Sequence, residues 1–257
     1  MYKESSAQDF RKKFGLPNDY VIDGFISYGA WNRNKHLCNI KESVSRSCSA
    51  SSVEWKTLTG FLGFVDEFTV GSKRYWFTVQ YGGALLSELT HLACLFGSKK
   101  NIHIGSCGGL KESLADTSVI IPSWTFGNES VTRIYGRNII DNKHSSHTGL
   151  SQELYSLLVG KCNLNQGPLF TNQGMMGETQ DDILSWSRAG YSGVEMETST
   201  LFAVSNYFKV PAAALVYISN NQIKGQLTGD GSHMVQKKDR EKIKELLYDT
   251  AIHVILK

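Results

Sequence analysis

Apolar residues follow strand-like spacing in some parts of the chain and helix-like spacing in others. Residues 74–80 (RYWFTVQ) are aromatic and β-branched, which predicts a strand. Residues 84–96 (ALLSELTHLACLF) carry apolar side chains at helical spacing, and Gly97 follows them, so we expect a helix that ends there. Apolar runs at 101–104 and 116–122 predict two further strands.

The C-terminal half continues this alternation. Its pattern predicts a helix over 198–208, a buried strand over 211–218 and an amphipathic helix over 237–256. A serine-rich stretch at 42–52 (ESVSRSCSASS) predicts a mobile loop. Strands that alternate with helices indicate an α/β fold, in which helices cover a mostly parallel or mixed sheet and ligands bind at the carboxyl ends of strands.

Composition narrows the class of protein. A chain of 257 residues with 41% hydrophobic and 20% charged residues is expected to form a single domain over 1–257. A net charge of +3 is too small to favour nucleic acid as a partner, and the longest apolar run, 210–218, is too short to span a membrane. The five scattered cysteines indicate reduced thiols and a cytoplasmic location.

We expect no metal site. His144 and His147 are three residues apart, but they lie in a polar run (DNKHSSHTG) with no cysteine or carboxylate cluster beside them.

The first candidate motif is the segment IHIGSCGGL at 102–110, in which a predicted strand runs into three glycines. Bare backbone N–H groups at such a turn bind anions, and the Ser106 hydroxyl adds a donor. The spacing matches neither a P-loop nor a dinucleotide-binding motif. The alternative is an ordinary glycine-rich turn.

The second motif is GVEME at 193–197, directly before the predicted helix at 198. In an extended segment, Glu195 and Glu197 point to the same side, which suits acceptance of hydrogen bonds from a vicinal diol such as that of a ribose. The alternative is that both carboxylates lie near the helix N-terminus because the helix dipole favours negative charge there.

The third motif is Ser219-Asn220-Asn221-Gln222, which follows the buried strand at 211–218. Amides at the carboxyl end of a strand are placed to read the hydrogen-bonding edge of a planar ligand. The alternative is a polar turn.

Together, GSCGG, GVEMET and the Ser-Asn-Asn segment resemble the nucleoside phosphorylase family, which includes purine nucleoside phosphorylase, uridine phosphorylase and methylthioadenosine nucleosidase. Gly29-Ala30-Trp31-Asn32-Arg33 keeps the spacing of the family's phosphate motif. The resemblance implies a three-layer α/β/α sandwich around a mixed, partly barrel-like sheet. It also implies a homo-oligomer, dimer or hexamer, that uses inorganic phosphate as co-substrate and needs no cofactor.

The resemblance further implies a role for each matching residue. Phosphate, ribose and base would each have their own set of contacts, and Glu197, Asn220 and Arg33 would be catalytic. The sets are Gly29, Arg33, His103 and Ser106 for phosphate; Glu195, Met196 and Glu197 for ribose; and Met175, Val194 and Asn220 for the base.

Three positions depart from the family pattern. His103 stands where phosphorolytic relatives have an arginine, Thr59 where some relatives lend a second arginine to a neighbouring subunit, and Asn220 where the purine enzymes have an acid. An amide cannot protonate a leaving adenine, whereas a 6-oxopurine can leave as an anion supported by hydrogen bonds. We therefore expect a phosphorylase for a purine-type nucleoside, with 6-oxopurines the favoured bases. A nucleosidase using water or a uridine-type phosphorylase is the alternative, and an inactive nucleoside-binding protein is the third hypothesis.

Overall fold

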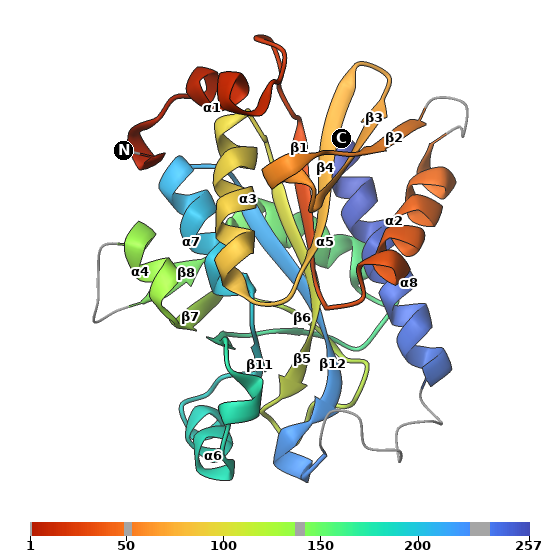
Figure 1. Ribbon diagram of the computed structural model, residues 1–257. Helices are drawn as coiled ribbons and strands as arrows, with labels where there is room; N and C mark the ends of the chain where they lie inside the picture. Colours follow the sequence, from red (N-terminus) through yellow and green to blue (C-terminus); the bar gives the residue numbers. More distant parts are fainter. Residues whose placement is uncertain (1, 49–52, 137–141, 227–236) are drawn as a thin grey trace.

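The computed structural model describes residues 2–48, 53–136, 142–226 and 237–257 (Figure 1). Within these residues, twelve strands form one mixed sheet. The strands are β1 (Gly24–Gly29), β2 (Val53–Thr57), β3 (Val65–Val70), β4 (Lys73–Gln80), β5 (Asn101–Gly109), β6 (Val119–Ile121), β7 (Trp124–Asn128), β8 (Lys143–Ser145), β9 (Leu164–Gln166), β10 (Leu169–Asn172), β11 (Gly193–Glu195) and β12 (Ala212–Asn221). The α-helices are α1 (Ala7–Phe14), α2 (Arg33–Ser47), α3 (Gly83–Leu95), α4 (Ser130–Gly136), α5 (Thr148–Leu158), α6 (Gln180–Arg188), α7 (Thr198–Phe208) and α8 (Lys237–Leu256).

The centre of the sheet is parallel. β5 pairs in parallel with β1 on one side and with β12 on the other, and β1 pairs in parallel with β4. The order along the main path is β2-β3-β4-β1-β5-β11-β10-β7-β8, and β12, β6 and β9 branch from β5. The path does not return to β2, so the sheet is open within the described residues. Parallel neighbours bring the carboxyl ends of β1, β5 and β12 to one edge, where side chains from distant segments meet.

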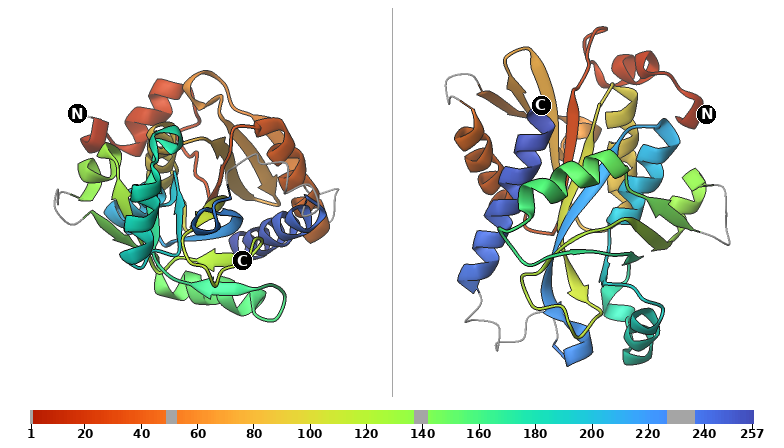
Figure 2. Two further views of the ribbon diagram at one scale, coloured as in Figure 1. Left: turned by 90° about the horizontal axis from the view of Figure 1, so that it is seen from below. Right: turned by 180° about the vertical axis from the view of Figure 1, so that it is seen from behind.

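Helices cover both faces of the sheet (Figures 1 and 2). α2, α5 and α8 pack on one face, and α1, α3 and α7 pack on the other. Side chains of successive strand residues point to opposite faces of the sheet. Ile26 therefore packs in the core under α2, α5 and α8, and its neighbour Phe25 packs in the core under α1, α3 and α7. The predicted three-layer sandwich and mixed sheet are therefore confirmed.

Most of the predicted elements are present. The strand at 74–80 and the helix at 84–96 correspond to β4 and α3, and the predictions for 198–208 and 237–256 match α7 and α8. Gly97 follows α3 with a positive φ of 97°, as a helix-terminating glycine should. The strand predicted over 116–122 is shorter and covers three residues of β6.

Two local predictions were wrong. The GSCGG segment is not a turn, because β5 continues to Gly109 while pairing with both β12 and β11. The loop predicted over 42–52 is helical up to Ser47, because Ile40 and Val44 are fully buried in the core that α8 shares. Its remaining part, 49–52, lies outside the described residues.

The sequence also predicted reduced cysteines, no metal site at His144 and His147, and no membrane-spanning segment. All five cysteines are unpaired. His144 bonds to Asn142, whereas His147 accepts the Leu150 N–H at the start of α5, so the two rings serve separate structural contacts. In the part of the chain that the structure describes, we find no helix with the length and apolar content that crossing a bilayer requires.

Asn221 shows how a buried amide holds the end of β12. Its Nδ2 donates to the carbonyls of Lys111 and Leu114 at 2.9 and 2.8 Å, and its Oδ1 accepts the N–H groups of Ile223 and Lys224. These bonds tie the loop after β5 to the short 3-10 helix η5 (Gln222–Lys224).

We expect Asn221→Ala to lower the free energy of unfolding by about 3 kcal/mol, because it leaves several backbone N–H and C=O groups without a hydrogen-bond partner. Asn206→Ala is the matched control, since that side chain makes one exposed bond to Ser145 and should cost less than about 1 kcal/mol. Urea unfolding measures both, and equal losses would contradict the role assigned to Asn221.

Candidate active site

A cavity of about 200 Å³ lies where β1, β5 and β12 end beside the junction of β11 and α7. Eight of the ten predicted site residues line it, and Arg33 and His103 do not. The lining residues are Gly29, Ala30, Trp31, Tyr81, Ser106, Cys107, Gly108, Met175, Glu178, Val194, Glu195, Met196, Glu197, Ser219, Asn220 and Gln222. Ser106 and Glu197, from strands and loops far apart in sequence, thus face one space.

Glu195 is a buried carboxylate that holds the start of α7. One oxygen accepts the Thr171 hydroxyl, and the other accepts the N–H groups of Glu197 and Thr198 at 2.8 and 2.7 Å and the Thr198 hydroxyl at 2.7 Å. The helix-terminus alternative considered for the GVEME motif therefore describes Glu195. Its oxygens already accept four hydrogen bonds, so Glu197 is the carboxylate of this pair with more capacity to accept from a ligand.

Glu197 is 5% exposed and stands at the N-cap of α7. Its Oε1 accepts the N–H of Gly82, the residue that precedes α3, at 2.6 Å. Its Oε2 faces Gly29, where a Cβ would lie only 2.6 Å from it, so a glycine is required for this approach. Burial, and then the charge of Glu195, raise the pKa of Glu197 to about 8, although the N–H groups of Gly82 and Met196 favour the carboxylate.

His103 lies behind this carboxylate rather than on the cavity wall. The ring is 1% exposed, and its Nδ1 is 2.9 Å from the Ser27 hydroxyl oxygen. Burial lowers the pKa of His103 to about 3, so the ring is neutral between pH 6 and 8. A neutral ring cannot supply the positive charge of the arginine that phosphorolytic relatives have at this position, and the phosphate contact predicted for His103 stays a prediction.

His103, Glu195 and Glu197 each offer one ligand atom within 4.8 Å of the others. Imidazole and carboxylate are acceptable ligands for a divalent cation. Four hydrogen bonds already occupy the oxygens of Glu195, so this cluster is a poor cage for a metal.

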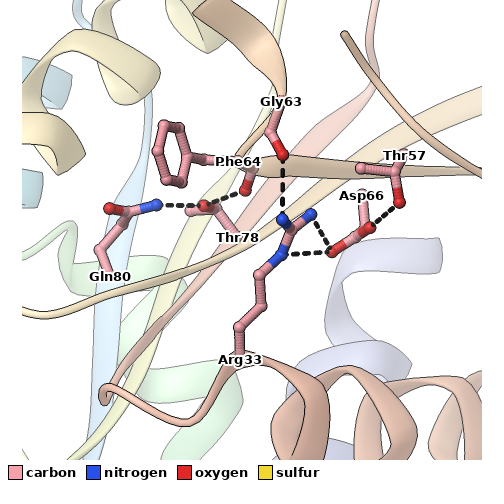
Figure 3. A network of polar contacts seen from close by, with 7 residues as sticks. All are labelled: Arg33, Thr57, Gly63, Phe64, Asp66, Thr78 and Gln80. Atoms are coloured by element: carbon pink, nitrogen blue, oxygen red, sulfur yellow. Dashed lines mark hydrogen bonds and ion pairs between the residues drawn. The ribbon is translucent and has the colours of Figure 1, made fainter.

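Arg33 does not line the cavity, because its guanidinium is bound to Asp66 and to the Gly63 carbonyl (Figure 3). Its Nε and Nη2 donate to one oxygen of Asp66 at 3.2 and 2.8 Å, and its Nη1 donates to the Gly63 carbonyl at 2.9 Å. Asp66 also accepts the Thr57 hydroxyl at 2.6 Å. The guanidinium therefore joins the start of α2 to β3. As a consequence, the described residues that line the cavity include three glutamates but no lysine or arginine.

At another part of the wall, Glu178, which no motif predicted, lies beside amide side chains that include Gln222 of the third motif. Glu178 accepts from the Asn172 and Gln222 amides, both at 3.2 Å, and burial raises its pKa. Asn220 is already engaged, since its Nδ2 donates to the Gln226 carbonyl and its Oδ1 accepts the Ser219 hydroxyl. Nothing in the run MMGETQ marks Glu178 in the sequence, whereas Gln222 directly follows the Ser-Asn-Asn segment.

Two aromatic side chains stand at the exposed part of the wall. Trp31 is 75% and Tyr81 is 50% exposed, and their ring centroids are 5.8 Å apart. The site is therefore a pocket with buried carboxylates, strand-end amides and glycines inside and aromatic rings outside.

A family model, the phosphorylase superfamily, matches residues 38–252. The chain belongs to this superfamily. The resemblance inferred from GSCGG and GVEMET is thus confirmed, and the match extends over most of the described elements.

Curated relatives in this superfamily are distant. The DeoD-type purine nucleoside phosphorylase of Clostridium beijerinckii is 27% identical over 136 residues, which are 52% of this chain and 56% of that protein. The DeoD-type enzyme of a Geobacillus species is 25% identical over 179 residues, which are 68% of this chain and 74% of that one. The first match thus spans little more than half of the relative.

Solved structures share the fold. Uridine phosphorylase from Vibrio fischeri aligns with a TM-score of 0.74 at 17% identity, over 92% of each chain. A second structure of that enzyme, in complex with 6-hydroxy-1-naphthoic acid, aligns with a TM-score of 0.75 at 16% identity, over 96% of this chain and 99% of that one. At such identities the likeness establishes the architecture alone.

The raised pKa of Glu197 predicts how stability depends on pH. The unfolded chain loses this proton near pH 4.5 and the folded chain near pH 8, so the free energy of unfolding should fall as pH rises between these values. Glu197→Gln should flatten this fall, and Glu42→Gln, at an exposed position, should leave it unchanged. Thermal unfolding from pH 5 to 9 measures the difference, and parallel curves for wild type and Glu197→Gln would contradict the buried acid.

Proposed function

We propose that this chain cleaves the N-glycosidic bond of a purine-type nucleoside with inorganic phosphate and releases the free base and a pentose 1-phosphate. The observation that carries the proposal is the shared cavity of Ser106, Gly29 and Glu197, in which Glu197 Oε2 closely approaches the Gly29 backbone. Membership of the superfamily and the DeoD-type relatives support it.

The carboxylates suit the charge that develops during this reaction. As the bond to the base breaks, the sugar gains positive charge, and a nearby anion stabilises that state more than it stabilises the bound substrate. Glu197, whose pKa burial raises to about 8, would supply that anion in its ionised form, which a positive charge on the sugar favours. Glu197 would accept from the ribose hydroxyls, Met196 would pack against the sugar, and Met175 and Val194 would contact the base. Glu195 would act by holding the Glu197 backbone N–H at the start of α7.

In this proposal, phosphate would bind to backbone N–H groups and to the Ser106 hydroxyl, on the part of the cavity wall that Gly29 and Ser106 form. Arg33 would have to leave Asp66 to reach an anion, and His103 would contribute only as a neutral ring. The absence of a cationic side chain from the described wall supports hydrolysis as a second candidate function. Because the described wall has no cationic side chain, water could be the acceptor, which would make the chain a nucleosidase.

The decisive assay measures base release from adenosine, inosine, guanosine and uridine by chromatography, using phosphate-depleted protein. Phosphorolysis requires phosphate and yields ribose 1-phosphate, whereas hydrolysis proceeds equally without it and yields ribose. Glu197→Gln should lower the rate by about 100-fold or more, because it removes a transition-state contact. Glu42→Gln is the control, and a Glu197→Gln variant of normal rate would contradict the proposed ribose contact.

We further propose a cytoplasmic homo-oligomer. Three exposed aromatic side chains close to the Arg33 network, Trp31 (75%), Phe61 (47%) and Phe64 (48%), support an apolar contact between copies. Sedimentation equilibrium measures the mass, and a monomer at micromolar concentration would contradict this assembly.

A further inference from the structure

We propose that Glu178 is the acid that protonates the leaving base, and that Glu178 and Gln222 together select a 6-aminopurine. The inference rests on the proposed nucleoside cleavage and identifies its substrate class. It reverses the expectation that Asn220, being an amide, turns the site towards 6-oxopurines.

Glu178 is held in a defined orientation on the cavity wall. It directly follows the 3-10 helix η4 (Met175–Gly177), whose Met175 also lines the cavity, and it precedes α6. Amide groups of Asn172 and Gln222 donate to its two oxygens, both at 3.2 Å. Two weak contacts orient the carboxyl group and leave each oxygen able to bond a ligand as well.

The surroundings shift the pKa of Glu178 upwards, although the Asn172 and Gln222 amides that donate to it act in the opposite direction. Burial raises its pKa, and Asp182 in the first turn of α6 adds to the rise by its negative charge. Glu195 and Glu197 line the same cavity, where no lysine or arginine is present among the described lining residues. A carboxylic acid in such a site can donate its O–H to an acceptor on the ligand.

Gln222 places an acceptor beside this donor. Its Nε2 donates to Glu178, whereas its Oε1 is buried without a hydrogen-bond partner. Gly108 makes room for this amide, because a Cβ there would lie 2.6 to 3.0 Å from three atoms of the Gln222 side chain. An unpaired buried acceptor is costly, so a ligand N–H that reaches it contributes to binding.

A donor next to an acceptor matches one edge of adenine. That edge presents N7 as an acceptor and the 6-amino group as a donor, whereas guanine presents two acceptors, N7 and O6. Glu178 O–H would donate to N7, and Gln222 Oε1 would accept from the 6-amino group. A 6-oxopurine would instead place its oxygen against the Gln222 oxygen, which is repulsive.

The chemical step then balances. The bond from the sugar's anomeric carbon to N9 breaks, and its electron pair goes to the base. The Glu178 proton passes to N7, so the base leaves neutral and Glu178 becomes a carboxylate that regains its proton from solvent. Phosphate oxygen, the acceptor in the proposed function, forms the new bond to the anomeric carbon.

The test compares two leaving groups. Adenine needs protonation, whereas the phenolate of 4-nitrophenyl β-D-riboside leaves without it. Glu178→Gln should lower kcat for adenosine by about 100-fold or more and leave kcat for the nitrophenyl riboside within about threefold, as expected for loss of a general acid. Asp181→Asn, an exposed acid in the first turn of α6, is the matched control and should retain both rates.

Equal losses on both substrates would make Glu178 a structural residue and overturn the inference, as would an unchanged rate on adenosine. Faster wild-type cleavage of inosine than of adenosine would overturn the assignment of a 6-aminopurine.

Calorimetry with free bases separates this inference from the proposed function. Wild type should bind adenine about tenfold or more tightly than hypoxanthine, and Gln222→Met should remove that preference, because it deletes the acceptor and keeps the volume. If wild type releases no base from any nucleoside, the proposed function fails, and adenine selectivity that depends on Gln222 would still support the base-reading pair. Equal binding of the two bases would overturn it.

Discussion

Two carboxylates, Glu195 and Glu197, are buried together at the start of α7, and the rest of the site is arranged around them. Charged groups of like sign in a low-dielectric interior repel each other and lose their hydration, so they persist only where donors compensate. The first turn of α7 donates to Glu195, and Gly82 at the start of α3 donates to Glu197. Two helices on the same face of the sheet are thus oriented by one acidic pair.

This pair also sets the electrostatic character of the cavity. With His103 neutral and Arg33 held by Asp66, the described wall favours positive charge on a ligand over negative charge. In the proposed cleavage, such a wall would stabilise a sugar that becomes cationic and would contribute little to the binding of phosphate. The same feature therefore supports glycosidic cleavage and makes the identity of the acceptor the main chemical question about this chain.

The part of the wall around Glu178 and Gln222 differs from this pair, since its polar side chains are amides and one acid. Asn221, buried at the end of β12, fixes η5, and η5 begins with Gln222. Gln222 in turn orients Glu178 on the opposite loop. A chain of hydrogen bonds from the sheet to the cavity wall thus gives this wall a fixed pattern of donors and acceptors.

Local patterns in the sequence were sufficient for the main helices and strands, because α3, α7, α8 and β4 each bury a periodic apolar face. The motifs also pointed to the cavity-lining residues Ser106, Glu195, Glu197 and Asn220, which lie in or directly after the carboxyl-terminal parts of β5, β11 and β12. Composition misjudged residues 42–47, where packing of Ile40 and Val44 against the α8 layer outweighs the serines. It also misjudged GSCGG, where pairing on both edges keeps the glycines extended.

Partners across long sequence separations were beyond any local pattern. Arg33 lies beside Asp66, His103 beside Ser27, and Glu178 beside Gln222, and each pairing changes the charge or the donor capacity that the residue type alone would suggest. The sequence gives the type of each side chain, but burial and the nearest partner determine its protonation state and its orientation. Those two quantities arise only when the sheet brings distant strands together.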